Sequence, residues 1–121
     1  MAVILVIEDD PGLRDLLEEA LSGAGHLALA ASNGNDGVKL CSAHPLQLVI
    51  TDILMPEKEG LETIQEIRSK FPLTPILAMS GAPDGWKVLE LARRLGADET
   101  LSKPFAPTVM LAFVDKLLKA A

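Results

Sequence analysis

Three short aliphatic runs constrain the fold of this chain more than any other feature of its sequence. They cover Val3–Ile7, Leu46–Ile50 and Pro75–Met79, and a single glutamine is the only polar residue in them. Such runs are typical of strands buried on both faces, as in parallel sheets covered by helices on each side. Two more polar segments, His26–Ala31 and Glu99–Ser102, are expected at the edges of the sheet. The sequence therefore predicts a parallel sheet of five strands.

Between these segments the apolar residues recur at the spacing of an α-helix. The first stripe follows Asp10, a suitable N-cap, and Pro11, a suitable first helical residue. Gly23 and Gly25 are expected to end this helix. The stripe consists of Leu13, Leu16, Leu17, Ala20 and Leu21. Similar stripes later in the chain are formed by Val38 and Cys41, by Leu61, Ile64 and Ile67, by Val88, Leu91, Ala92 and Leu95, and by Val109, Phe113 and Leu117.

Alternating strands and helices with short connections predict right-handed crossovers and helices on both faces of the sheet. With the first, third and fourth strands in the centre, the strand order is 2-1-3-4-5. This order is that of a doubly wound, flavodoxin-like α/β fold with five βα units. The 121 residues suit one such domain with a single core. The winding direction reverses between the first and third strands, and ligands are expected in the crevice beyond their carboxyl ends.

Polar residues follow the strands at the points where the apolar runs end. Glu8 and Asp9 follow the first strand, and Asp52 follows the third. Ser80 follows the fourth strand and Lys103 the fifth. Carboxylates gathered at one edge repel each other, and a divalent cation relieves that repulsion. Because the chain has no cluster of Cys or His at ligand spacing, Mg²⁺ fits this site better than zinc.

Asp52 is the candidate nucleophile because an ionised carboxylate can attack a phosphoryl group without a base. Glu57 and Glu59 lie near a predicted helix start instead, where acids favour the helix dipole. Phosphoryl transfer also needs positive charge and hydrogen-bond donors around the acceptor, for which Lys103 and Ser80 are the candidates.

The charge and hydropathy patterns exclude several classes of function. The formal net charge is -6 and the 11 basic residues form no long run, so direct nucleic-acid binding is not expected. The N-terminal apolar run is too short for a signal peptide or a membrane span, and we expect a cytoplasmic protein without membrane contact. The lone Cys41 is expected to be a small buried residue rather than a reactive thiol.

Four stretches of the chain, in the same order, resemble the receiver domain of two-component response regulators. They are Ile4–Pro11, Asp52–Pro56 followed by Gly60, Met79–Ala82 and Leu101–Phe105. The resemblance runs from Val3 to about Leu118 and implies one receiver domain over residues 1–121. It also implies that a histidine kinase or phosphotransfer protein donates a phosphoryl group to Asp52. The phosphorylated domain would then change its contacts with a downstream protein or a covalently linked domain, as a signalling phosphoacceptor rather than an enzyme.

The resemblance assigns roles to individual residues. Asp9 and Asp52 would bind Mg²⁺ directly, Glu8 would act through metal-bound water, and the backbone carbonyl of Leu54 would be a further ligand. Asp10 matches a variable acid, so capping the first helix is its expected role. Ser80 would bind a phosphoryl oxygen, and Lys103 would pair with the phosphate.

One departure from the family concerns the relay of the signal. Three residues before the lysine, the family often has a Tyr, Phe or His that turns inward on phosphorylation, and this chain has Thr100. The output is therefore expected to be coupled without a rotating ring at this position.

Two other functions remain open at the level of sequence. A small phosphatase could also use an Asp nucleophile after a parallel strand, but such enzymes typically have a second Asp two residues later, where this chain has Leu54. A receiver-like module that is never phosphorylated could serve only for protein contacts. The complete set of acids, Ser80 and Lys103 favours phosphorylation over this alternative.

Overall fold

The computed structural model describes residues 1–53, 60–81 and 85–120, and the side chains of all of these except residues 85 and 86. Within these residues the chain forms a parallel sheet whose strand order is β2-β1-β3-β4-β5. The strands are β1 (Val3–Ile7), β2 (Leu27–Ala31), β3 (Leu48–Asp52), β4 (Ile76–Ser80) and β5 (Glu99–Ser102). The predicted order and the two predicted edge strands are confirmed.

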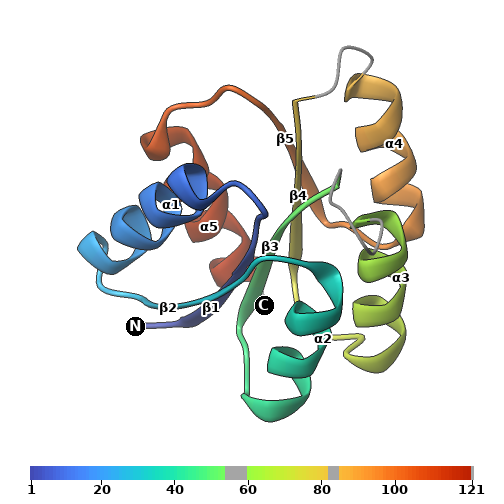
Figure 1. Ribbon diagram of the computed structural model, residues 1–121, viewed down its shortest axis with the longest axis horizontal. Helices are drawn as coiled ribbons and strands as arrows, with labels where there is room; N and C mark the ends of the chain where they lie inside the picture. The colour runs from blue at the N-terminus through green and yellow to red at the C-terminus, as the bar shows by residue number, and fades with distance from the viewer. Residues whose placement is uncertain (54–59, 82–84, 121) are drawn as a thin grey trace.

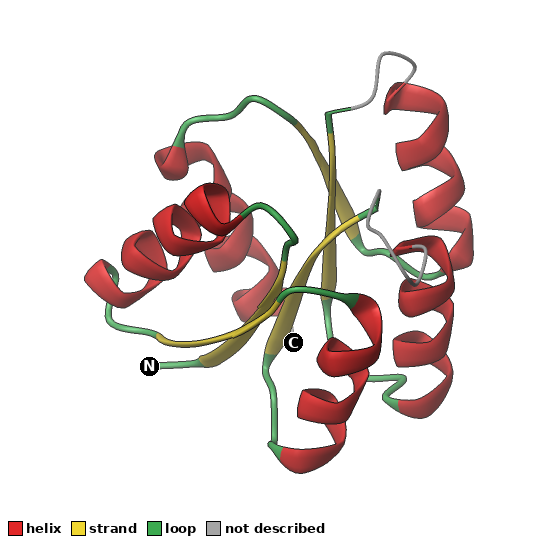
Figure 2. Cartoon of the chain, viewed as in Figure 1, coloured by secondary structure: helices red, strands yellow, loops and turns green. Residues whose placement is uncertain are grey.

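Helices cover both faces of the sheet (Figures 1 and 2). The helices are α1 (Pro11–Gly23), α2 (Gly34–Ala43), α3 (Gly60–Lys70), α4 (Gly85–Leu95) and α5 (Pro107–Ala120). Helices α1 and α5 lie on one face, and α2, α3 and α4 lie on the other. None of the described helices is long and apolar enough to cross a membrane.

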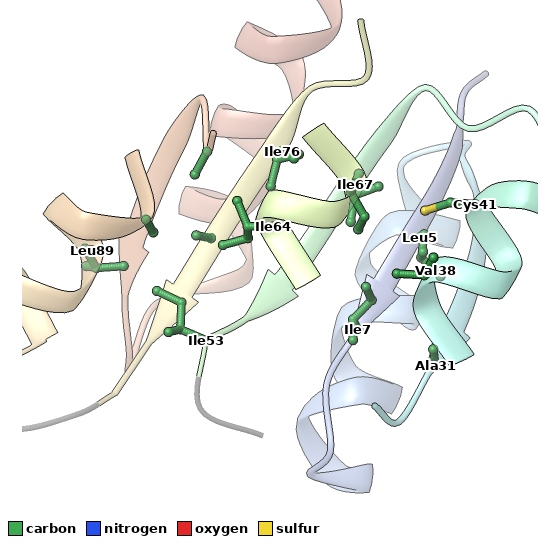
Figure 3. Close-up of a cluster of buried hydrophobic side chains, with 14 residues drawn as sticks. Leu5, Ile7, Ala31, Val38, Cys41, Ile53, Ile64, Ile67, Ile76 and Leu89 are labelled. Atoms are coloured by element: carbon green, nitrogen blue, oxygen red, sulfur yellow. The ribbon is translucent and has the colours of Figure 1, made fainter. Parts of the chain in front are cut away.

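The core is divided by the sheet into two layers because successive strand residues point to opposite faces. In β1, Leu5 and Ile7 pack with Ile64 and Ile67 on the α2–α3–α4 side (Figure 3). Ile4 and Val6, which alternate with them, belong to the layer under α1 and α5. All four β1 side chains are fully buried, and each contributes about 1.5–3 kcal/mol through burial. The prediction of strands buried on both faces is therefore confirmed.

The helical stripes differ from the prediction at three leucine and valine positions. Leu16, Leu91 and Val109 are 47%, 43% and 43% exposed, although each was assigned to a buried stripe. Each lies beside residues that do reach the core, such as Leu17 next to Leu16. A stripe read from sequence is wider than the strip of helix that contacts the sheet, so its flanking members remain in solvent.

The ends of the strands differ from the aliphatic runs in a way that matters for function. Strand β3 begins two residues later than its run and continues to Asp52, and β4 continues to Ser80. Asp52 is therefore held in the hydrogen-bonded ladder, with Met79 of β4 as its register partner. The first helix begins as predicted, with Asp10 as N-cap and its carboxylate accepting a hydrogen bond from Gly12 N at 3.0 Å.

Candidate functional site

Three carboxylates meet at the carboxyl ends of the two central strands. Glu8 and Asp9 follow β1, and Asp52 ends β3, which lies beside β1 in the sheet. One carboxylate oxygen from each of the three lies within 4.8 Å of the others. Glu8 and Asp52 are 1% and 5% exposed, whereas Asp9 is open to solvent. The site is thus an acidic cluster with two buried carboxylates and one that is exposed to solvent.

Lys103 brings a single positive charge into this cluster. Its Nζ lies 2.7 Å from Oε1 of Glu8 and 3.2 Å from Oδ2 of Asp52. The lysine directly follows β5, so its side chain reaches past β4 to the central strands. Its backbone N–H donates to the Ser80 carbonyl at 2.8 Å, and the Lys103–Pro104 peptide is cis. A side chain at Gly81 would come within 3.3 Å of the Lys103 Cβ, so the lysine packs on a bare backbone.

The charges at this site do not balance. Burial raises the pKa of Glu8, and the hydrogen bond from Lys103 only partly opposes that effect. Burial also lowers the pKa of Lys103, but its hydrogen bond to Glu8 and the charge of Asp52 outweigh burial, so the pKa is raised overall. Lys103 therefore stays protonated at neutral pH. Among the residues that the structure describes, one ammonium lies in a cluster of three carboxylates, and negative charge is left over.

Hydrogen bonds from the two neighbouring residues in the chain hold Asp52 at the end of β3. Its Oδ1 accepts a hydrogen bond from Ile53 N at 2.9 Å, while its carbonyl accepts one from the Thr51 hydroxyl at 3.0 Å. Gly60 N donates to the Ile53 carbonyl at 2.8 Å. A Cβ at Gly60 would lie 2.4 Å from the Asp52 carbonyl oxygen, so only glycine fits against this strand end. The carboxylate is fixed by Ile53 N at Oδ1 and lies beside the Lys103 ammonium at Oδ2.

Ser80 lies next to this cluster at the end of β4. It is 1% exposed, and it pairs in register with Ser102, the residue before Lys103. The structure thus brings Glu8, Asp9, Asp52 and Lys103 together and places Ser80 beside them. Leu54, the predicted carbonyl ligand, lies outside the described residues.

Comparison with known proteins agrees with this arrangement. A sequence model described as the response regulator receiver domain matches residues 4–115. The chain belongs to this family. Relatives include the alkaline phosphatase synthesis transcriptional regulatory protein PhoP of Bacillus subtilis, which is 31% identical over 96% of this chain and 48% of its own length. The transcriptional regulatory protein GltR of Pseudomonas aeruginosa is 35% identical over 98% of this chain and 49% of its own length. The chain spans about half the length of these relatives.

Solved receiver structures share the fold closely. The receiver domain of NtrX from Brucella abortus superimposes with a TM-score of 0.93 at 27% identity, over 98% of this chain and 99% of that one. The chemotaxis response regulator CheY4 of Vibrio cholerae gives 0.89 at 26% identity, over 97% of this chain and 98% of that one. The flavodoxin-like fold and the receiver family predicted from sequence are confirmed.

The donor set of this receiver domain fits a hard divalent cation. All the candidate side-chain ligands are carboxylate oxygens, which magnesium and calcium prefer over the nitrogen and sulfur ligands typical of zinc.

Cys41 is buried on the α2 side of the sheet, and burial raises the pKa of its thiol to about 11. The expectation of a small, buried Cys41 is confirmed.

Sequence reasoning missed one residue of the receiver site. The Nη1 of Arg14, in the first turns of α1, donates to the backbone carbonyl of Glu8 at 3.0 Å. The available signal was its position four residues after Asp10 in a helix, because residues at that spacing lie on one side of the helix. Thr100, which stands where the family often has an aromatic ring, is partly buried in β5 and pairs in register with Ala78.

Proposed function

We propose that residues 1–121 form one receiver unit in which Asp52 accepts a phosphoryl group from a phosphohistidine of a histidine kinase or phosphotransfer protein. The observation that supports this most directly is the unbalanced cluster around Asp52. Three clustered carboxylates, of which Glu8 and Asp52 lie 2.7 and 3.2 Å from the Lys103 ammonium, suit a bound cation that offsets their charge and attracts a phosphoryl group. The membership of the receiver family supports the same role.

The transfer step is a displacement at phosphorus. An Asp52 carboxylate oxygen forms the new O–P bond, and the P–N bond of the phosphohistidine breaks. The imidazole leaves with the electron pair of that bond and takes a proton from solvent. A carboxylate nucleophile attacks a phosphoryl group without the help of a base, so the step needs no further residue to activate Asp52.

Asp9 and Asp52, with Glu8 acting through water and the Leu54 carbonyl, would hold Mg²⁺, which supplies positive charge to the phosphoryl oxygens. Glu8 and Asp52 are buried and fixed by hydrogen bonds, whereas Asp9 is exposed at the open side. The carboxylate cluster is therefore accessible from solvent on the side of Asp9.

Lys103 and Ser80 sense the new group. The ammonium already lies 3.2 Å from Oδ2 of Asp52, so a small shift away from Glu8 lets it pair with a phosphoryl oxygen. The Ser80 hydroxyl donates to another phosphoryl oxygen from the neighbouring strand end. The hydrogen bond from Lys103 N, directly after β5, to the Ser80 carbonyl at the end of β4 links the two residues.

The phosphoryl group adds a charge of about -1.5 to -2 at neutral pH. Drawing Ser80 and Lys103 toward Asp52 biases the end of β4 and the segment after β5, and so the surface of α4, β5 and α5. The output is a changed contact with a downstream protein or a covalently linked domain. Because Thr100 carries no ring, the coupling in this chain runs through the backbone and the polar contacts of β5.

The proposal is tested by incubating the protein with MgCl₂ and a small acyl phosphate, then mapping the acid-labile adduct by mass spectrometry. Labelling is expected at Asp52 in the parent and is lost in Asp52→Asn. Asp115→Asn, a change of the same chemistry at an exposed position of α5, serves as the control and keeps the label. Equal labelling of Asp52→Asn and the parent would disprove the assignment. Steady turnover of an external phosphate ester would instead identify a phosphatase.

A further inference from the structure

The loop between β1 and α1 carries two of the three carboxylates of the site, and its conformation decides where they point. Two hydrogen bonds within the loop use carboxylate oxygens. Asp10 N donates to Oε2 of Glu8 at 3.1 Å, and Gly12 N donates to Oδ1 of Asp10 at 3.0 Å. Neither bond acts on the peptide unit that joins Glu8 to Asp9, which sets the direction in which Asp9 leaves the strand.

Arg14 holds this loop at both ends. Its backbone N–H donates to the Asp10 carbonyl at 2.9 Å, the first hydrogen bond of α1. Its Nη1 reaches back across the helix turn and donates to the Glu8 carbonyl at 3.0 Å. The Glu8 carbonyl belongs to the Glu8–Asp9 peptide unit, so this contact fixes the orientation of that unit. One residue of α1 therefore spans the whole acidic loop.

The guanidinium does not neutralise the site. Within the described parts of the chain, the ion pairs at this edge of the sheet are those of Lys103 with Glu8 and with Asp52. A cation whose role was charge compensation would be expected to contact a carboxylate in this acidic cluster. Arg14 instead donates to the Glu8 carbonyl, and the hydrogen bonds described for its guanidinium include none to a carboxylate oxygen of the site.

We propose that Arg14 is a positioning residue of the phosphoryl site, which orders the Glu8–Asp9 peptide unit before metal binds. This inference rests on the proposed function for the identity of the site. Without Arg14, Asp9 must be ordered when the metal binds, and that ordering opposes binding. Partners that orient metal ligands typically change metal affinity 10- to 100-fold when they are removed, so we expect a rise in the Mg²⁺ Kd of about tenfold.

The test titrates MgCl₂ into the parent, Arg14→Met and Arg14→Lys by isothermal titration calorimetry. Methionine keeps much of the side-chain length without a donor, and lysine keeps one donor for the Glu8 carbonyl. We expect a Kd about tenfold higher for Arg14→Met, and for Arg14→Lys a value between those of Arg14→Met and the parent. Arg94→Met is the matched control, because Arg94 is a 75% exposed arginine on α4 that pairs with Glu90. It should keep the parent Kd.

A second readout separates positioning from direct contact with the phosphoryl group. The labelling rate with a small acyl phosphate is measured as a function of MgCl₂ concentration. In Arg14→Met the half-saturating concentration should rise by the same factor as the Kd, while the rate at saturation stays near that of the parent. A thermal melt of each variant identifies any loss of folding. If Arg14→Met does not fold, the Kd and the labelling rate of Arg14→Lys are compared with those of the parent instead.

Two results would overturn this role for Arg14. One is an unchanged Mg²⁺ Kd in folded Arg14→Met, and the other is a fall in the saturated rate with no change in Kd. Neither result affects the assignment of Asp52, which depends on the site of labelling in the parent. If the parent takes up no phosphoryl group, the proposed function fails, and the calorimetric titration still decides the role of Arg14.

Discussion

A cluster at each end of the sheet holds a cation among acids and carbonyls, but among the described residues the charges balance in only one of the two clusters. At the carboxyl end, Lys103 faces the carboxylates of Glu8, Asp9 and Asp52. At the amino end, Arg68 of α3 pairs with Asp98 at 2.5 Å. The pair of Arg68 and Asp98 thus has one cation for one acid, whereas the described residues of the cluster around Asp52 have one cation for three acids.

The donors of Arg68 are divided among nearby acceptors. Its Nε and Nη2 donate to the Gly96 carbonyl at 3.0 and 2.8 Å, and Nη1 donates to the Pro72 carbonyl at 2.7 Å. Oδ2 of Asp98 also accepts from Ile76 N at 2.8 Å, at the start of β4. This cluster joins the ends of α3 and α4 to the first residues of β4 and β5. A balanced and saturated cluster stabilises the fold, whereas the unbalanced one keeps capacity to bind a ligand.

The largest expected effect tests whether Lys103, at the carboxyl end, acts in phosphoryl transfer or only stabilises the fold. Lys103→Met should lower the rate of Asp52 labelling about 100-fold, because a charge that stabilises the transferring group is removed. The measurement is the labelling rate with a small acyl phosphate at saturating MgCl₂. Lys119→Met, which removes a lysine from the exposed end of α5, is the control. A rate within twofold of the parent would show that Lys103 is structural, like Arg68.

The corresponding change at the amino end, in Arg68, is expected to alter the stability of the fold and not the labelling rate. Arg68→Met should lower the free energy of unfolding by about 2 kcal/mol, because two carbonyls and one carboxylate lose a charged donor. Urea denaturation measures this loss, and the labelling rate of the folded variant should match that of the parent. Arg94→Met provides the control, since its pair with Glu90 is exposed on one helix. Slower labelling in folded Arg68→Met would mean that the two ends of the sheet are coupled.

The same contrast explains what could be predicted from the sequence. The carboxyl end was predictable because the aliphatic runs locate the strands, and parallel strands bring their following residues to one edge. Asp52 and Ser80 could be assigned to strand ends without any knowledge of side-chain contacts. Lys103 could be named as the candidate positive charge in the same way, whereas the separate roles of Glu8 and Asp9 at the metal came from the family resemblance.

The amino end could not be predicted by the same reasoning. Arg68 meets Gly96 and Asp98 across 28 and 30 residues, and no periodic pattern links these positions. Arg14 is different, because its contact is local and its helical spacing from Asp10 is visible in the sequence. Its acceptor, however, is a backbone carbonyl, and a sequence pattern gives no indication of which carbonyl a side chain will reach.

Glu99 forms a third cluster, at the free edge of β5. It tests how much ion pairs stabilise the fold where they are exposed to solvent. Its Oε1 pairs with Arg93 of α4 at 2.9 Å, and its Oε2 pairs with Lys116 of α5 at 2.5 Å. The two helices cover opposite faces of the sheet (Figure 1). The Glu99 carboxylate therefore connects them around the edge strand. Both cations are at least half exposed, and exposed ion pairs are worth about 0.2–1 kcal/mol.

The smallest expected effect is therefore a pH-dependent one. The hydrogen bond from Lys116, joined by that from Arg93, holds the pKa of Glu99 below its ordinary value of 4.5 in the folded protein. A lowered folded pKa means that the stabilisation is present above pH 4.5 and is lost as the pH falls through the folded pKa. Glu99→Gln should thus be less stable than the parent by about 0.5 kcal/mol at neutral pH. This difference should shrink as the pH is lowered below 4.5.

Urea denaturation of the parent and Glu99→Gln at a series of pH values measures this difference, with Glu19→Gln on the exposed side of α1 as the control. High salt should also reduce the difference, because exposed pairs are screened. If the difference persists unchanged in acid, the carboxylate charge is not its source, and Glu99 stabilises the edge of the sheet by packing rather than by its two ion pairs.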